Sequence, residues 1–168
     1  AAQPASYLVF PEDRHHSIVM TRDLPLRWIE RGAGGAFVDT ASRGEFLSFQ
    51  LGVFALRGAL DSLSVEFSDL TGDAGGVIDA SLLTCFNLGG IDHQQRAFRK
   101  NVGVDSGSIQ PLWCGVQVPR EITPGRYSGS VSVGAAGRVR TVVPVTIFLR
   151  DNVVAAAGGR FVAFVLHE

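Results

Sequence analysis

The chain has 168 residues, of which 46% are hydrophobic and 18% charged, and its formal net charge is −1. The apolar content excludes an intrinsically disordered chain. The charge, close to zero with scattered arginines, provides no field that would attract nucleic acid or an anionic membrane surface. No apolar run reaches the ~18–20 residues that a membrane span needs. We therefore expect a single domain over residues 1–168, with no nucleic-acid partner and no membrane span.

Short apolar runs recur along the chain, separated by glycine, proline and polar residues. None of them combines a helical period with capping residues at both ends. About ten short strands at this spacing predict an all-β fold, an antiparallel β-sandwich that is Ig-like or jelly-roll-like. In chain order, the predicted strands are residues 7–10, 26–30, 46–56, 63–67, 82–88, 97–104, 112–118, 126–133, 139–149 and 161–166.

The composition between these strands divides the chain further. Residues 31–43 are small and polar and predict a loop or an internal linker, so residues 1–42 would form N-terminal strands and a loop, and residues 43–150 the sandwich core. Residues 151–159 predict a flexible connection, which the apolar run 161–166 follows. Because an exposed apolar edge strand promotes aggregation, we expect residues 151–168 either to pair back into the sheet or to lead into another domain or a partner.

Residues 111–133 form the most regular part of the sequence. Leu112, Cys114, Val116 and Val118 recur at every second position, and Tyr127 begins a second run with the same period. Such alternation is typical of strands with one buried and one solvated face. The Pro-Gly pair between the two runs suits a tight turn. This segment predicts a strand, a corner and a strand at the edge of the sandwich.

Cys85 and Cys114 are the two cysteines, and each lies in a predicted strand. One interpretation is a pair of buried free thiols that act as small hydrophobic side chains. The other is a disulfide, which requires the two Cα atoms to come within ~7 Å. It would close a loop of about thirty residues and stabilise the fold by roughly 3–4 kcal/mol. Neither cysteine has histidines at the spacing of a zinc site.

No segment carries a convincing catalytic or metal-binding pattern. His15-His16, Asp92-His93 and the three aspartates of residues 69–79 all fall in predicted loops or turns, without a nucleophile or ligand spacing nearby. We therefore expect no catalytic residue, no cofactor and no metal site. Trp28 and Trp113 are the candidate carbohydrate-binding residues, because an exposed indole can stack on a sugar ring.

Five blocks in order carry a family resemblance: RGEFLSFQLGVFA (residues 43–55), LSVEFSDL (63–70), NLGGID (87–92), QPLWCGVQVP (110–119) and TPGRYSGSVSV (123–133). This set resembles the N-terminal β-sandwich domain of glycoside hydrolase family 123. In that family the sandwich precedes a TIM-like barrel, whose Asp-Glu pair serves substrate-assisted hydrolysis of N-acetylgalactosaminides. A barrel takes about 250 residues, and no such stretch exists here, so no catalytic residue is carried over.

The resemblance implies a non-catalytic accessory domain of a larger exported, glycoside-hydrolase-like protein. Its partner would be a catalytic domain or a companion chain, and its location extracellular or at the cell surface. The first residues, AAQPASYLVF, lack the pattern of a signal peptide but resemble the start of a mature exported chain. The alternatives are a carbohydrate-binding or adhesion module and a structural subunit of an extracellular assembly.

Overall fold

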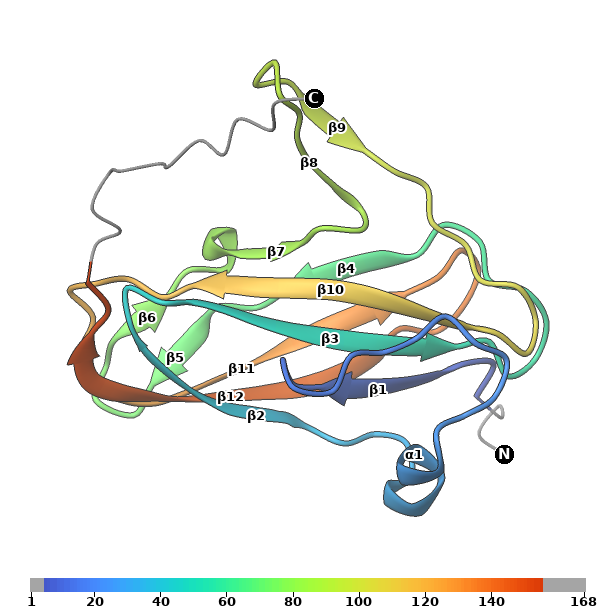
Figure 1. The fold of residues 1–168 in the computed structure, drawn as a ribbon, viewed down its shortest axis with the longest axis horizontal. Coiled ribbons are helices and arrows are strands. Elements are labelled where there is room, and N and C mark those ends of the chain that lie inside the picture. Colours follow the sequence, from blue (N-terminus) through green and yellow to red (C-terminus); the bar gives the residue numbers. More distant parts are fainter. Residues whose placement is uncertain (1–4, 156–168) are drawn as a thin grey trace, which may run out of the picture.

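Two facing β-sheets and a separate two-stranded ribbon make up the computed structural model, which describes residues 5–155 (Figure 1). The predicted all-β sandwich is confirmed. The first sheet contains, in spatial order, β1 (Leu8–Glu12), β3 (Phe46–Phe54), β10 (Ile109–Gln117) and β7 (Leu83–Cys85). The second contains β2 (Phe37–Arg43), β12 (Thr141–Val153), β11 (Gly125–Gly134), β5 (Leu70–Gly72) and β6 (Val77–Ile78), with β4 (Ser64–Phe67) also paired to β11.

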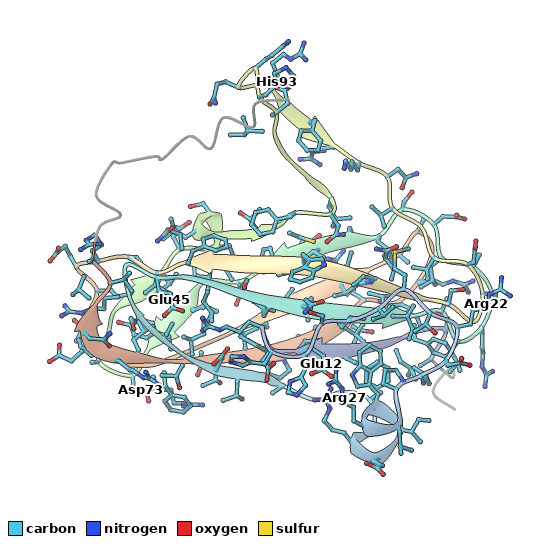
Figure 2. All side chains as sticks on the ribbon, viewed as in Figure 1. Glu12, Arg22, Arg27, Glu45, Asp73 and His93 are labelled. Atoms are coloured by element: carbon cyan, nitrogen blue, oxygen red, sulfur yellow. The ribbon has the colours of Figure 1, made fainter. Side chains whose placement is uncertain are left out.

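The ribbon consists of β8 (Gly89–Ile91) and β9 (Ala97–Arg99), which pair antiparallel. It projects away from the two sheets, with His93 at its tip (Figure 2). Two short helical segments complete the described chain, namely α1 (Leu26–Arg31) and the 3-10 turn η1 (Ala80–Leu82).

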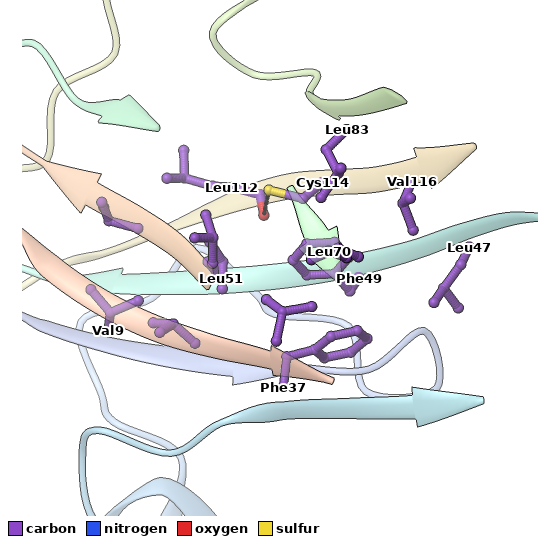
Figure 3. Packing of buried hydrophobic residues seen from close by; sticks show 14 of the residues in the cluster. Val9, Phe37, Leu47, Phe49, Leu51, Leu70, Leu83, Leu112, Cys114 and Val116 are labelled. Atoms are coloured by element: carbon purple, nitrogen blue, oxygen red, sulfur yellow. Dashed lines mark hydrogen bonds between the residues drawn. The ribbon is translucent and has the colours of Figure 1, made fainter. Parts of the chain in front are cut away.

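The core lies between the sheets and follows the period-two pattern of the long strands (Figure 3). Every second residue of a strand points into this layer, so each long strand supplies three or four apolar side chains. The inward residues are Leu47, Phe49, Leu51 and Val53 of β3, Leu112, Cys114 and Val116 of β10, Tyr127, Val131 and Val133 of β11, and Val143, Val145, Ile147 and Leu149 of β12.

The predicted strand–corner–strand unit exists, but its two strands belong to different sheets. β10 lies between β3 and β7, and β11 lies between β12 and the pair β4 and β5. The expectation of a sheet edge is therefore wrong, since alternation shows which face is buried and not which neighbours pair. The buried Tyr127 closes the corner by donating its hydroxyl to the Thr123 carbonyl at 2.7 Å, an arrangement known as a tyrosine corner.

Tyr127→Phe is expected to lower the free energy of unfolding by about 1 kcal/mol, because it removes this hydrogen bond and leaves the ring in place. Urea unfolding followed by fluorescence measures the change. Tyr7→Phe is a useful comparison, since the Tyr7 hydroxyl lies 2.8 Å from the carbonyl oxygen of Val133, at the other end of β11, and 2.8 Å from that of Val139, just before β12. An unchanged midpoint for Tyr127→Phe would show that the corner forms without its hydroxyl.

A second crossing between the sheets lies beside this corner. The turn at Gly44, where φ is +78°, links β2 of the second sheet to β3 of the first. Gly44 N donates to Val118 O at 3.2 Å, and Val118 N donates to Glu45 O at 2.9 Å. The two crossings are thus hydrogen-bonded to each other.

Glu45 secures this turn through its carboxylate, which accepts from Ser42 N at 2.8 Å and from the Arg14 guanidinium. Partial burial tends to raise the pKa of Glu45, but these two hydrogen bonds and the positive charge of Arg14 lower it below its usual value. A lowered folded-state pKa gives stability that is present above the unfolded pKa. That stability is lost as the pH falls from about 4.3, the ordinary glutamate value, through the folded-state pKa.

Glu45→Gln is therefore expected to cost about 1 kcal/mol at neutral pH, where the carboxylate is charged. The difference from wild type should shrink on acidification through the window below about pH 4. Thermal unfolding of both proteins along a pH series measures this. A difference that stays constant with pH would contradict the role of the Glu45 charge.

Several predicted secondary-structure elements were wrong, because the structure of these segments depends on partners far away in the sequence. Residues 26–30 form helix α1 and not a strand, and residues 37–43 of the expected loop form β2. β2 pairs in parallel with β12, and after an irregularity beyond Arg150 this pairing resumes at Val153, where a flexible connection was expected. Of the predicted strands 82–88 and 97–104, the segments Leu83–Cys85 and Ala97–Arg99 are strands. The predicted strand 161–166 lies outside the described residues.

Candidate binding surface

The outer face of the first sheet is divided into a covered half and an open half. Over the covered half, helix α1 places Trp28 against the sheet, where its ring stacks on Phe10 with centroids 4.4 Å apart and planes at 8°. Phe54, Ile109 and Ile18 complete this second apolar cluster. Gly52 is required beneath the indole, because a Cβ there would overlap Cη2 of Trp28.

A buried carboxylate holds the helix on the sheet. Glu12 of β1 is 4% exposed, accepts hydrogen bonds from Trp28 Nε1 and from Arg31 at 3.0 Å, and forms an ion pair with Arg27 at 3.1 Å. Figure 2 shows Glu12 and Arg27 beside α1. The structure does not present Trp28 for its predicted role in carbohydrate binding, because the indole is 1% exposed, stacks on Phe10 and donates its N–H to Glu12.

The open half carries three aromatic side chains, Phe46, Phe86 and Trp113, which we call the aromatic patch. They are 43%, 48% and 40% exposed, respectively. The rings of Phe46 and Phe86 lie 5.8 Å apart, tilted by 52°. Trp113 is the predicted platform residue, and the structure places it at the surface, with its neighbour Cys114 in the core.

Strand pairing explains why these residues meet. Phe46 begins β3, Trp113 lies in β10, and Phe86 follows β7, which are neighbouring strands of the first sheet. Phe86 N donates to Trp113 O at 2.8 Å, so these two residues face each other across the β7–β10 pair. Gly115 provides the floor of the patch, since a Cβ there would overlap the Phe46 ring. A larger residue would push that ring off the sheet.

Polar groups border the aromatic patch on one side. A hollow of about 370 Å³ is lined by Phe86, Trp113, Asn87, Lys100, Val102 and Gln110. Asn87 Oδ1 accepts from Trp113 N, and Gln110 Nε2 donates to Pro111 O at 2.9 Å. The lining thus combines aromatic faces, two amides and one ammonium group, with no carboxylate among these six residues. This chemistry suits binding rather than acid–base catalysis.

Asp92 and His16, two of the residues noted in the sequence, have structural partners. Asp92 closes the ribbon turn by accepting from Gln94 N and Arg96 N, and the backbone bond from Arg96 is the main reason that its pKa is lowered. His16 contacts Asp13 at 2.8 Å in an exposed loop. Among residues 5–155, no group of three His, Cys, Asp or Glu side chains could hold a metal ion.

The two cysteines lie side by side on neighbouring strands. Cys85 and Cys114 are direct partners in the β7–β10 register, and both are free thiols in this structure. Cys114 is buried in the main core (Figure 3), while Cys85 is half-buried. The required proximity is therefore met, and the disulfide itself stays a prediction.

Comparisons with known proteins reveal a shared fold. No family model and no curated protein matches the chain. A family 123 glycoside hydrolase from Clostridium perfringens, whose structure was analysed for glycolipid glycan hydrolysis, matches with a TM-score of 0.59 and 16% identity. The match covers 76% of this chain but 25% of that protein, so the chain corresponds to about a quarter of its length. At this identity the likeness establishes the fold alone.

Two further solved structures match less well. They are a PapD-like domain of human CEP192, at 12% identity, and the sporulation control protein Spo0M from Bacillus subtilis, at 10%. The matches cover 90% and 89% of this chain, and 92% and 51% of those chains, with TM-scores of 0.45 and 0.46. These scores are too low to support an argument.

No helix among the described residues is long and apolar enough to cross a membrane.

Sequence reasoning singled out Trp113 but missed Phe46 and Phe86 as its companions. The signal for Phe46 was present, because it shares the outward positions of its strand with the polar Ser48 and Gln50. An aromatic residue among polar ones on that face is unusual. Phe86 offered no such signal, since its neighbours became known only through the pairing of β7 with β10.

Proposed function

We propose that the chain is a non-catalytic accessory β-sandwich domain of a larger exported, glycoside-hydrolase-like protein. It would dock on the catalytic module of that protein through the aromatic patch. The observation that carries this proposal is the open half of the first sheet, where Phe46, Phe86 and Trp113 remain 40–48% exposed while α1 covers the rest.

The physical argument is the free energy available from covering the aromatic patch. Three large rings on one strand-built surface can desolvate together, and aromatic residues are enriched in the centres of protein interfaces. The amides of Asn87 and Gln110 supply a polar border of the kind that surrounds such a centre. An open aromatic surface with polar edges suits a protein partner better than it suits an enclosed small molecule.

The likeness to the family 123 hydrolase supports the same proposal. In that protein the matching fold makes up 25% of the chain, so the fold occurs there as part of a larger enzyme. In the proposed parent protein, the aromatic patch would form the contact between this chain and the catalytic module. Export follows from the proposed parent class and is part of the proposal.

The test begins with the reading frame beyond the codon for Glu168. The polypeptide encoded there, or a companion chain from an adjacent gene, is made separately and titrated calorimetrically against the 168-residue chain. We expect association, and we expect Phe46→Ser together with Phe86→Ser to weaken it by about tenfold or more. Val142→Ser is the matched control, because Val142 is an apolar residue that is 59% exposed on the second sheet.

Two results would contradict the proposal. One is that neither polypeptide contains a pair of catalytic carboxylates. The other is that association is absent, or that the patch variant and Val142→Ser weaken it equally. Circular dichroism of each variant establishes that it is folded before its binding is interpreted.

Carbohydrate binding is a second candidate function, favoured by the hollow beside Trp113. An indole that is 40% exposed, next to the amides of Asn87 and Gln110, offers a stacking surface and hydrogen-bonding groups for a sugar. Titration with oligosaccharides that contain N-acetylgalactosamine tests it. Binding that Trp113→Ala abolishes and Phe46→Ser preserves would support this function over docking. If titration to high sugar concentration produces no heat of binding, carbohydrate binding is excluded for those glycans.

A further inference from the structure

The Cys85–Cys114 pair lies on neighbouring strands at a separation that a disulfide can span. The two residues face each other in antiparallel register. The hydrogen bond from Phe86 N to Trp113 O marks the adjacent pair as hydrogen-bonded, so Cys85 and Cys114 occupy a non-hydrogen-bonded site. At such sites the Cα atoms lie about 4.5 Å apart, which is within the span of a disulfide, about 4.4–6.8 Å.

The two thiols differ in their access to solvent. Cys114 is fully buried, with its sulfur 3.9 Å from the Leu112 carbonyl oxygen. Cys85 is half-buried and lines a hollow of about 420 Å³ beneath the β8–β9 ribbon. Arg99 and Lys100 line the same hollow. A small anionic reagent can therefore reach Cys85 first, and the two cations would favour it.

The electrostatic environment also favours Cys85 as the reactive thiol, because it shifts the pKa values of the two thiols in opposite directions. A hydrogen bond from Cys114 lowers the pKa of Cys85 despite partial burial, and the backbone N–H groups of Asn87 and Leu88 lower it further. The same thiol contact and deep burial raise the pKa of Cys114 well above its usual value. Because the thiolate is the attacking form, Cys85 is the nucleophile of the pair.

We propose that Cys85 and Cys114 form a thiol–disulfide exchange site, which a small anionic disulfide of the glutathione type oxidises through the hollow at Arg99 and Lys100. The Cys85 thiolate attacks one sulfur of the reagent, a mixed disulfide forms, and the first reagent thiolate leaves. Cys114 then loses its proton and attacks Cys85 Sγ, which releases the second reagent thiolate. Two protein thiols are thus oxidised to one disulfide while the reagent is reduced to two thiols.

The site lies next to the aromatic patch along both strands. Phe86 follows Cys85, and Trp113 precedes Cys114. A covalent bond between β7 and β10 would fix the separation of these two aromatic residues. The redox state of the pair would then set the rigidity of the patch, although the exchange reaction itself does not depend on the proposed docking function.

Mass spectrometry with oxidised glutathione tests the exchange step. For Cys114→Ala we expect one glutathione to attach to Cys85 in the folded chain. For Cys85→Ala we expect a rate lower by about tenfold or more, because Cys114 is buried. The wild-type chain should lose two hydrogens, and peptide mapping should find residues 85 and 114 linked. Circular dichroism checks the fold of each variant.

The basic residues of the hollow provide the specificity control. Arg99→Gln together with Lys100→Gln should slow the reaction with oxidised glutathione, but not with the uncharged bis(2-hydroxyethyl) disulfide. Equal modification rates of Cys85 and Cys114, or a wild-type chain that keeps both thiols in fully oxidising glutathione, would overturn the proposal. Should an alanine variant not fold, limited alkylation of the wild-type chain tests the same order of reactivity, since Cys85 must be labelled first.

Discussion

Trp28→Ala is expected to lower the free energy of unfolding by about 3–5 kcal/mol, the usual cost of removing a large buried aromatic side chain. The indole is 1% exposed, covers Gly52 and stacks on Phe10. Its loss would also leave the Glu12 carboxylate without its indole donor. Because α1 buries no other side chain, the whole helix is expected to detach from the sheet. Urea unfolding followed by circular dichroism measures the change.

Trp113→Ala is the matched control for this prediction. It removes the same side chain from a site that is 40% exposed, and it should change the stability by about 0.5 kcal/mol or less. A comparable loss for the two variants would contradict the division of the outer face into a covered and an open half. A loss below about 1 kcal/mol for Trp28→Ala would show that α1 is not an essential part of the fold.

Formation of the Cys85–Cys114 disulfide is expected to raise the free energy of unfolding by about 3–4 kcal/mol, because it closes a loop of about thirty residues in the unfolded chain. The gain should be visible as a higher urea midpoint for the oxidised chain than for the reduced chain. This prediction depends on the exchange site proposed above, and it is measured on the wild-type protein without substitution.

Cys85→Ser provides the control, since it has one thiol and should unfold at the same urea concentration in oxidising and reducing buffer. An oxidised wild-type chain that is cross-linked yet no more stable would mean that strain in the native strands offsets the loop-closure gain. An oxidised chain less stable than the reduced one would show that the bond distorts the β7–β10 pair.

Burial along the long strands could be predicted from the sequence because it is a local property. Alternation over residues 112–118 placed Leu112, Cys114 and Val116 in the core and Trp113 outside, and the structure agrees. The turn between β5 and β6 was likewise marked by its glycines and aspartates. In each case one face or one turn is encoded within a few consecutive residues.

The remaining features depend on partners far away in the sequence. β2 has no strong pattern of its own, and it forms because β12 offers a parallel partner about a hundred residues later. Residues 26–30, LRWIE, alternate like a strand and yet form a helix. The reason is that Glu12 accepts the indole N–H of Trp28, and Gly52 leaves room for its ring. The aromatic patch could not be predicted for the same reason, since its members come from β3, from β10 and from the residue after β7.

The paired crossings at Gly44 and Val118 have a mechanical consequence. At this end of the sandwich the backbone passes twice between the layers, and two hydrogen bonds join the passages. Sliding one layer over the other would have to break both bonds, so this end resists shear. Phe46 of the patch lies two residues beyond Gly44. A force applied to the patch on the first layer would therefore be transmitted directly to the second, and both layers would respond as one body.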